Sequence, residues 1–66
     1  MCLATVYEEA KSPGSILCRN ITKIEVNGDK IKLIDIMGAE TFYIGHIVSA
    51  ELSGGTVILK KSEGAA

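Results

Sequence analysis

The fold is decided by residues 21–36, ITKIEVNGDKIKLIDI, in which a tight-turn sequence separates two strand patterns. The first pattern, residues 21–26, is the clearest part of a strand that begins at Ile16. Asn27-Gly28-Asp29 follows it and supplies residues that tolerate the left-handed backbone of a tight hairpin turn. The stretch therefore predicts an antiparallel hairpin.

The return strand of this hairpin, residues 30–36, has an irregular apolar pattern. Its apolar positions change parity, from Ile31 and Leu33 to Ile34 and Ile36. We expect either a bulge that resets the register or a strand that is covered on both faces.

Further strands are predicted on both sides of the hairpin, at residues 2–8, 41–44, 46–52 and 56–61. Turn residues separate the predicted strands: the cluster at 11–15, residues 37–40, a bend at Gly45, and Ser53-Gly54-Gly55. Strict alternation in residues 46–52 places Val48, Ala50 and Leu52 on one face with His46. No stretch has helical periodicity, and the chain contains no internal repeat. We predict an all-β fold, a small antiparallel barrel of the SH3-like or OB-like kind.

The size and apolar content of the chain predict a homodimer. Residues 1–61 form one predicted domain and residues 62–66 a flexible C-terminal tail. A domain of this size buries only about 60% of the surface of its unfolded chain. Yet 47% of the 66 residues are hydrophobic and the mean hydropathy is +0.28. This apolar surplus indicates a second face that another copy covers.

The charge balance argues against a polyanion-binding protein. Seven Lys and Arg stand against eight Asp and Glu, for a net charge of −1. The alternative is a small nucleic-acid-binding barrel with a lysine stripe and stacking aromatic faces. The residues for it would be Lys23, Lys30, Lys32, Lys60 and Lys61, with Tyr7, Phe42 and Tyr43. Because Lys30 and Lys32 alternate with apolar residues as on any solvated face, nucleic-acid binding is not favoured.

The chain shows no export or membrane signal. It has no run of the roughly 20 consecutive apolar residues that a membrane-spanning helix needs. Its N-terminus also lacks the basic region followed by an apolar region that marks a signal peptide. A cytoplasmic location without membrane association is predicted. The two cysteines are then expected to be reduced.

Met1-Cys2 offers the strongest metal-binding chemistry in the chain. A thiolate, the terminal amine and the intervening backbone nitrogen can close small chelate rings around one soft or borderline divalent ion. Two such termini brought together by a two-fold axis would complete a four-coordinate site of the kind that suits Ni(II) or Cu(II). The alternative is that Cys2 aligns with Ala4 and Val6 as a small buried hydrophobe.

Cys18 and His46 have simpler interpretations. Cys18 is expected to pack in the core or at a strand end. His46 could serve as a further ligand or a general base, but without a second histidine a hydrogen-bonded residue at a strand start is favoured. A nucleophilic triad of Cys18, His46 and Asp35 has no local signature and is discounted.

The order of these motifs resembles the CooT family, small nickel-binding accessory proteins of carbon monoxide dehydrogenase maturation, also described as predicted RNA-binding proteins. The resemblance rests on Met1-Cys2-Leu3-Ala4 before a strand, the hairpin at 26–33, residues 34–38 with a following acidic residue, Gly45-His46-Ile47 and the closing strand at 56–59. It implies a dimeric β-protein whose nickel ligand is the Cys2 thiolate, with Met1 as the amine donor. The resemblance assigns no metal role to Cys18 or His46.

We therefore expect a small cytoplasmic, non-enzymatic Ni(II) metallochaperone or nickel store. The resemblance implies a client nickel metalloenzyme such as carbon monoxide dehydrogenase. The alternative is a small RNA-binding or other nucleic-acid-binding β-barrel.

Overall fold

Five β-strands and one short 3₁₀ turn make up the part of the chain that the computed structural model describes, residues 3–62. In chain order these are β1 Ala4–Glu8, η1 Pro13–Ser15, β2 Ile16–Asn27, β3 Lys30–Asp35, β4 Glu40–Glu51 and β5 Thr56–Lys61.

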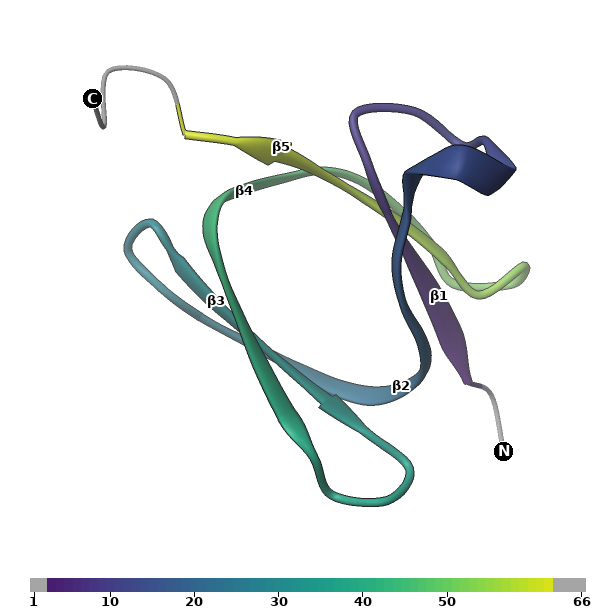
Figure 1. Ribbon diagram of the computed structural model, residues 1–66, viewed down its shortest axis with the longest axis horizontal. Helices are drawn as coiled ribbons and strands as arrows, with labels where there is room; N and C mark the ends of the chain where they lie inside the picture. The colour runs from purple at the N-terminus through teal and green to yellow at the C-terminus, as the bar shows by residue number, and fades with distance from the viewer. Residues whose placement is uncertain (1–2, 63–66) are drawn as a thin grey trace.

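The strands form a closed barrel in the order β1-β2-β3-β4-β5 (Figure 1). Four of the five pairings are antiparallel, as predicted, whereas β1 and β5 pair in parallel. The parallel pairing follows from the count of strands. When five consecutive strands alternate in direction, the first and the last run the same way, so closure can only be parallel. The small all-β barrel is confirmed, and its dimerisation stays a prediction.

The β2–β3 hairpin forms where the sequence predicts it. Gly28 has φ +63°, and Asn27 faces Lys30 across the turn. The register irregularity of this pair lies in β2, between Ile21 and Lys23, and the pairing of β3 with β4 is regular. The change of parity at Ile34 therefore needs no bulge in β3.

β4 is one continuous strand, which corrects the prediction of separate strands at 41–44 and 46–52. Its first half pairs with β3 and its second half with β5, and Gly45 lies at the change of partner. A Cβ at Gly45 would overlap the carbonyl oxygen of Lys60 and lie 2.7 Å from Cε2 of Tyr43. Only glycine permits this close approach of the backbones, so the strand bends at Gly45 without breaking.

A register shift between Ile47 and Ser49 overturns the face predicted for β4. His46 faces Lys60 and Ala50 faces Val57, three residues apart on β5. Directly opposed residues share a face, and positions three apart on a strand lie on opposite faces. His46 and Ala50 therefore point to opposite sides of the sheet, because the extra residue of the bulge reverses the alternation.

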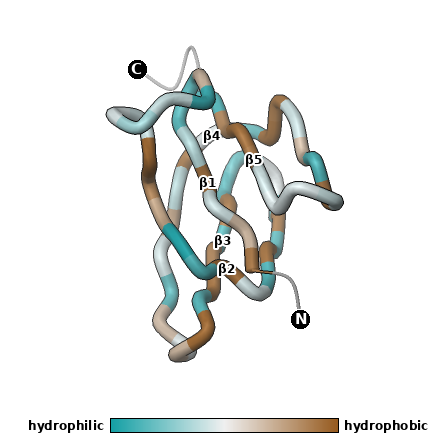
Figure 2. The backbone as a smooth tube through the Cα atoms, turned by 90° about the vertical axis from the view of Figure 1, so that its right-hand side faces the viewer, coloured by the Kyte–Doolittle hydropathy of each residue, from teal (hydrophilic) through white to brown (hydrophobic). Residues whose placement is uncertain are grey.

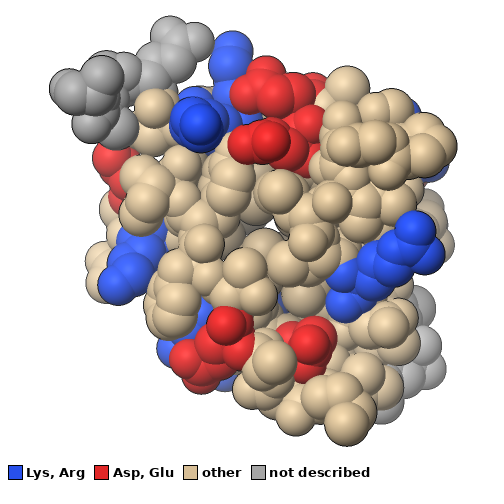
Figure 3. All heavy atoms as spheres, viewed as in Figure 1, with Lys and Arg blue, Asp and Glu red and all other residues tan. Residues whose placement is uncertain are grey.

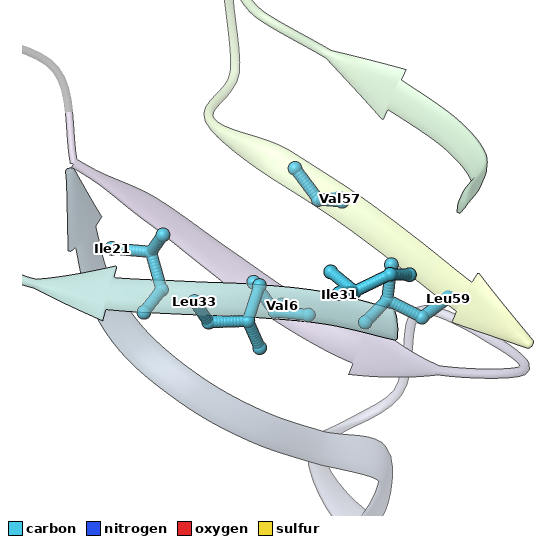
Figure 4. Close-up of a cluster of buried hydrophobic side chains, with 6 residues drawn as sticks. All are labelled: Val6, Ile21, Ile31, Leu33, Val57 and Leu59. Atoms are coloured by element: carbon cyan, nitrogen blue, oxygen red, sulfur yellow. The ribbon is translucent and has the colours of Figure 1, made fainter. Parts of the chain in front are cut away.

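The core consists of six aliphatic side chains from β1, β2, β3 and β5 that point toward one another inside the barrel (Figure 4): Val6, Ile21, Ile31, Leu33, Val57 and Leu59. Figure 2 shows hydrophobic and hydrophilic residues following one another along the strands, as expected for walls with one buried face. Full burial of such a side chain contributes about 1.5–3 kcal/mol.

The start of β1 and the end of β5 lie on different sides of the barrel (Figure 1). Of the predicted tail, Ser62 is described and its N–H donates to the carbonyl of Ile44 at 3.2 Å; residues 63–66 lie outside the described residues. Within residues 3–62 there is no helix of the length and hydropathy that a membrane span requires.

Candidate functional site

The two predicted metal ligands, Met1 and Cys2, lie outside the described residues. Description begins at Leu3, which is bonded to Cys2. Leu3 is therefore the described residue nearest in sequence to the predicted ligands.

Leu3 lies in an open groove of about 420 Å³, the N-terminal groove, between the start of β1, the middle of β2 and the β4–β5 turn. Its lining is mainly apolar: Leu3, Ala4, Ile21, Thr22, Lys23, Ile24, Glu51, Leu52, Gly55 and Val57. Ile21 and Val57 belong to the buried core, while Leu52 is 80% exposed. The groove thus opens toward the core, and the exposed side chain of Leu52 forms part of its wall.

The start of β1 is held by the β4–β5 turn. The N–H of Thr5 donates to the carbonyl of Gly55 at 2.8 Å, and Thr5 faces Thr56 in the parallel pairing. From there β1 pairs regularly with β5 as far as Glu8. The start of β1 is therefore fixed to the β4–β5 turn.

At the far end of β1, Tyr43 joins β4 to β1. Its hydroxyl donates to Oε2 of Glu8 at 2.8 Å. Burial, followed by this hydrogen bond to a carboxylate, raises the pKa of Tyr43 to about 12. Tyr43 consequently stays neutral near pH 7, with its hydroxyl engaged.

Cys18 packs where the sequence places it. It is half-buried against the core cluster and faces Val6 across the β1–β2 pairing. Its thiol is free of any disulfide within the described residues.

His46 and Asp35 are not brought together with Cys18. His46 is exposed on β4 and faces Lys60 of β5. Lys60 lies four positions after Thr56, the residue that faces Thr5 at the start of β1. At about 3.3 Å a residue, this places His46 roughly 13 Å along the barrel wall from the start of β1. The carboxylate of Asp35 accepts the N–H groups of Met37 and Ala39, at 2.8 and 3.0 Å, and so closes the β3–β4 turn.

No group of three or more His, Cys, Asp or Glu side chains within residues 3–62 is arranged to hold a metal ion. The described part of the barrel wall therefore supplies no metal centre of its own. Metal binding through Met1 and Cys2 stays a prediction.

Three of the five lysines of the nucleic-acid alternative, Lys23, Lys30 and Lys32, contact acidic or aromatic side chains. Glu25 forms ion pairs of 3.0 Å with both Lys23 and Lys32. The hydrogen bonds from Lys32 and then Lys23 hold the pKa of Glu25 below its usual range, and Glu25 raises the pKa of Lys32. The ammonium of Lys30 lies 4.8 Å from the ring centroid of Phe42 and covers that aromatic face.

These groups surround a small hollow of about 170 Å³ lined by Glu25, Asn27, Lys30, Lys32 and Phe42. On the face of the molecule drawn in Figure 3, basic and acidic side chains lie around uncharged surface. The charges of Lys23 and Lys32 are thus compensated by Glu25.

Sequence reasoning missed the N-terminal groove and the contact of the β4–β5 turn with the start of β1. The signal available in the sequence was Gly54-Gly55 before the last strand, which indicates a turn but not what the turn touches.

Comparison with known families identifies the family of the chain. The family model described as CO dehydrogenase accessory protein CooT matches residues 1–60, which includes Met1, Cys2, the first four strands and β5 as far as Lys60. No curated protein matches the chain significantly. Since the family model spans nearly the whole of the 66 residues, the chain belongs to the CooT family of CO dehydrogenase accessory proteins.

Proposed function

We propose that this protein binds Ni(II) through the thiolate of Cys2, with the amine of Met1 as a second donor, and acts as a metallochaperone or nickel store for metalloenzyme maturation. One observation carries the proposal: the match to a family described as CO dehydrogenase accessory protein extends to the first residue and so includes both donors. An accessory role supplies a metal to an enzyme and requires no catalysis from this chain.

The donor set suits this cargo. A thiolate and amine or amide nitrogens favour Ni(II) and Cu(II) over hard cations, and Cu(II) binds such sites at least as tightly. Selectivity for nickel therefore comes from the availability of the metal and from the client, such as carbon monoxide dehydrogenase.

The N-terminal groove supports a site shared between two copies. One Met1-Cys2 segment supplies too few donors for four-coordination. A two-fold axis at the groove would bring two such segments together and would cover Leu52 and Leu3, which line the groove. Apolar surface of this kind is what an isologous interface covers.

The nucleic-acid alternative has less support. Lys23 and Lys32 are paired with Glu25, and Lys30 covers the ring of Phe42. Neutralising several phosphates would require these ion pairs to break.

The test is Ni(II) titration of the untagged protein under reducing conditions, followed by calorimetry and by absorption in the thiolate-to-metal region. We expect one Ni(II) ion per dimer. Binding should strengthen as the pH rises from about 6 to about 8, because each ligand sheds a proton on coordination. Cys2→Ser removes the thiolate and should show no stoichiometric binding. Cys18→Ser is the matched control and should bind as the parent does.

The amine is tested separately by a Gly-Ser extension ahead of Met1. The extension keeps the thiol and moves the free amine, so the affinity should fall or the spectrum change. Full nickel binding by Cys2→Ser, together with loss in His46→Ala, would place the site on β4 and refute the proposal.

A further inference from the structure

The β2–β3 turn contains an asparagine followed by a glycine, Asn27-Gly28. Both residues are exposed, and the turn projects from one side of the barrel (Figure 1). A Cβ built on Gly28 would meet nothing within 4 Å. No group within residues 3–62 accepts the N–H of Gly28 in a hydrogen bond. The backbone nitrogen of Gly28 is therefore unhindered and available to react.

The side-chain amide of Asn27 is the reaction partner of this nitrogen. After its proton passes to hydroxide, the nitrogen of Gly28 attacks Cγ of Asn27, so that an N–Cγ bond forms and a succinimide ring closes. The Cγ–Nδ2 bond breaks, and the leaving nitrogen takes a proton from water and departs as ammonia, which regenerates the hydroxide. Because glycine has no Cβ beside its nitrogen, this ring closure is least hindered at an asparagine that precedes glycine.

Water then opens the ring at either of its two carbonyl carbons. Cleavage of the new N–Cγ bond leaves an aspartate at position 27. Cleavage of the original peptide bond leaves an isoaspartate, in which the main chain runs through the former side chain. Both products carry a carboxylate where the parent has a neutral amide, and water is the only reactant consumed.

The register of the hairpin places this carboxylate beside a lysine. Asn27 faces Lys30, and directly opposed residues share a face of the sheet. Both line the small hollow that also contains Glu25, Lys32 and Phe42. Lys32 is already paired with Glu25, whereas the ammonium of Lys30 lies over the ring of Phe42. Lys30 is therefore the cation that a new carboxylate would draw, because a charge-assisted hydrogen bond is stronger than a neutral one.

We propose that Asn27 is a deamidation site of the folded protein and that Lys30 holds the carboxylate formed there. This inference goes beyond the proposed function and does not depend on nickel binding. Deamidation would add a negative charge to the hollow and draw Lys30 away from the ring of Phe42.

The two products should differ in stability. The turn is tied to β4 by the N–H of Gly45, which donates to the carbonyl of Asp29 at 2.7 Å. Isoaspartate lengthens the main chain just ahead of Gly28 and so disturbs this tie. Aspartate keeps the length of the main chain and is a favoured turn residue. The isoaspartate form should therefore unfold at lower urea concentration than the aspartate form.

The other asparagine of the chain, Asn20, provides an internal control. It is exposed like Asn27 but lies within β2. Ile21 follows it, and the buried, β-branched side chain of this residue crowds its own backbone nitrogen. The carbonyl of Asn20 also accepts the N–H of Ile36 at 2.9 Å, which restrains the peptide unit that would have to react.

The experiment incubates the full-length protein at mildly alkaline pH and measures the converted fraction of each asparagine by peptide mass spectrometry. A parallel sample is unfolded in guanidinium chloride. In the folded protein, Asn27 should convert at least about tenfold faster than Asn20 because of the crowding at Ile21. Its rate should lie within about tenfold of the unfolded rate, since an exposed turn needs little opening to react. Conversion of Asn27 only in the unfolded sample, or equal conversion of both asparagines, overturns the proposal.

The role of Lys30 is tested on the aspartate product, made directly as Asn27→Asp. The pKa of the new carboxyl is measured by NMR in this variant and in the same variant with Lys30→Gln. Lys11→Gln is the control, since Lys11 does not line the hollow. Loss of Lys30 should raise the proton affinity of the carboxyl at least about twofold, and loss of Lys11 should leave it unchanged. The same pKa in all three proteins overturns the role given to Lys30.

Discussion

At the scale of single residues, Tyr43 shows how one side chain joins segments that are distant in sequence. Its hydroxyl donates to Glu8, 35 positions away, at the end of β1 opposite the N-terminal groove. The ring belongs to the partly buried shell packed against the core. The residue therefore links the core, β4 and β1.

Tyr43 should ionise late and with a measurable effect on stability. Its pKa is raised in the folded state from about 10 to about 12, so its contribution to stability is complete below pH 10 and is lost as the pH rises toward 12. A spectrophotometric titration should show a tyrosine phase near pH 12 that is absent in Tyr43→Phe. The free energy of unfolding should fall less steeply between pH 10 and pH 12 in that variant, and an equal fall in both proteins would contradict the assignment.

At the scale of elements, β4 determines how the barrel closes. It pairs with β3 over Glu40–Ile44 and with β5 over Gly45–Glu51, so one strand serves two walls. The carbonyl of Asp29 accepts the N–H of Gly45 at 2.7 Å and so ties the β2–β3 turn to this bend. The bend of β4 thus depends on close backbone packing around Gly45.

Gly45→Ala should be strongly destabilising. Its Cβ would overlap the carbonyl oxygen of Lys60, and relief of this overlap would separate β4 from β5. We expect a loss of about 3 kcal/mol or more in the free energy of unfolding, measured by urea denaturation. Gly14→Ala is the control, since a Cβ there meets nothing within 4 Å, and it should stay within about 0.5 kcal/mol of the parent. Equal stabilities would show that the bend of β4 tolerates a side chain.

At the scale of the whole molecule, the barrel has a small interior and an apolar exterior. Six residues make up the buried hydrophobic core, while large apolar side chains such as Leu52 and Met37 are 80% and 87% exposed. Every strand of the closed barrel already pairs with two neighbours, which limits strand pairing with another chain. Association would therefore use side chains, and the N-terminal groove offers the surface next to the proposed ligands.

The protein should be a homodimer through this groove. Light scattering at micromolar concentration should report twice the 7.0 kDa chain mass. Leu52→Glu should shift the protein toward monomer because it places a charge in the interface. Met37→Glu, at an equally exposed position outside the groove, should stay dimeric. A parent that is monomeric at this concentration would remove the shared site.

RNA binding should be absent at physiological salt. The net charge is −1, and Glu25 already pairs with two of the lysines that would contact phosphates. Fluorescence anisotropy with mixed single-stranded RNA measures this. Micromolar binding that weakens steeply with added salt would support the nucleic-acid alternative instead.

By itself the sequence determined the parts of this protein that depend on neighbouring residues. The turn at Gly28, the strand at Thr56–Lys61 and the packing of Cys18 follow from local turn chemistry and alternation, which act over a few residues. The proposed ligands Met1 and Cys2 are likewise a sequence inference, supported by the family match over residues 1–60.

Tertiary structure decided the features that depend on distant segments. These are the continuity of β4 through Gly45, the bulge that turns His46 and Ala50 to opposite faces, and the contact of Gly55 with Leu3. A glycine looks the same in sequence whether it faces solvent or a backbone carbonyl of another strand. Such close approaches arise only once the barrel closes and brings the two backbones together.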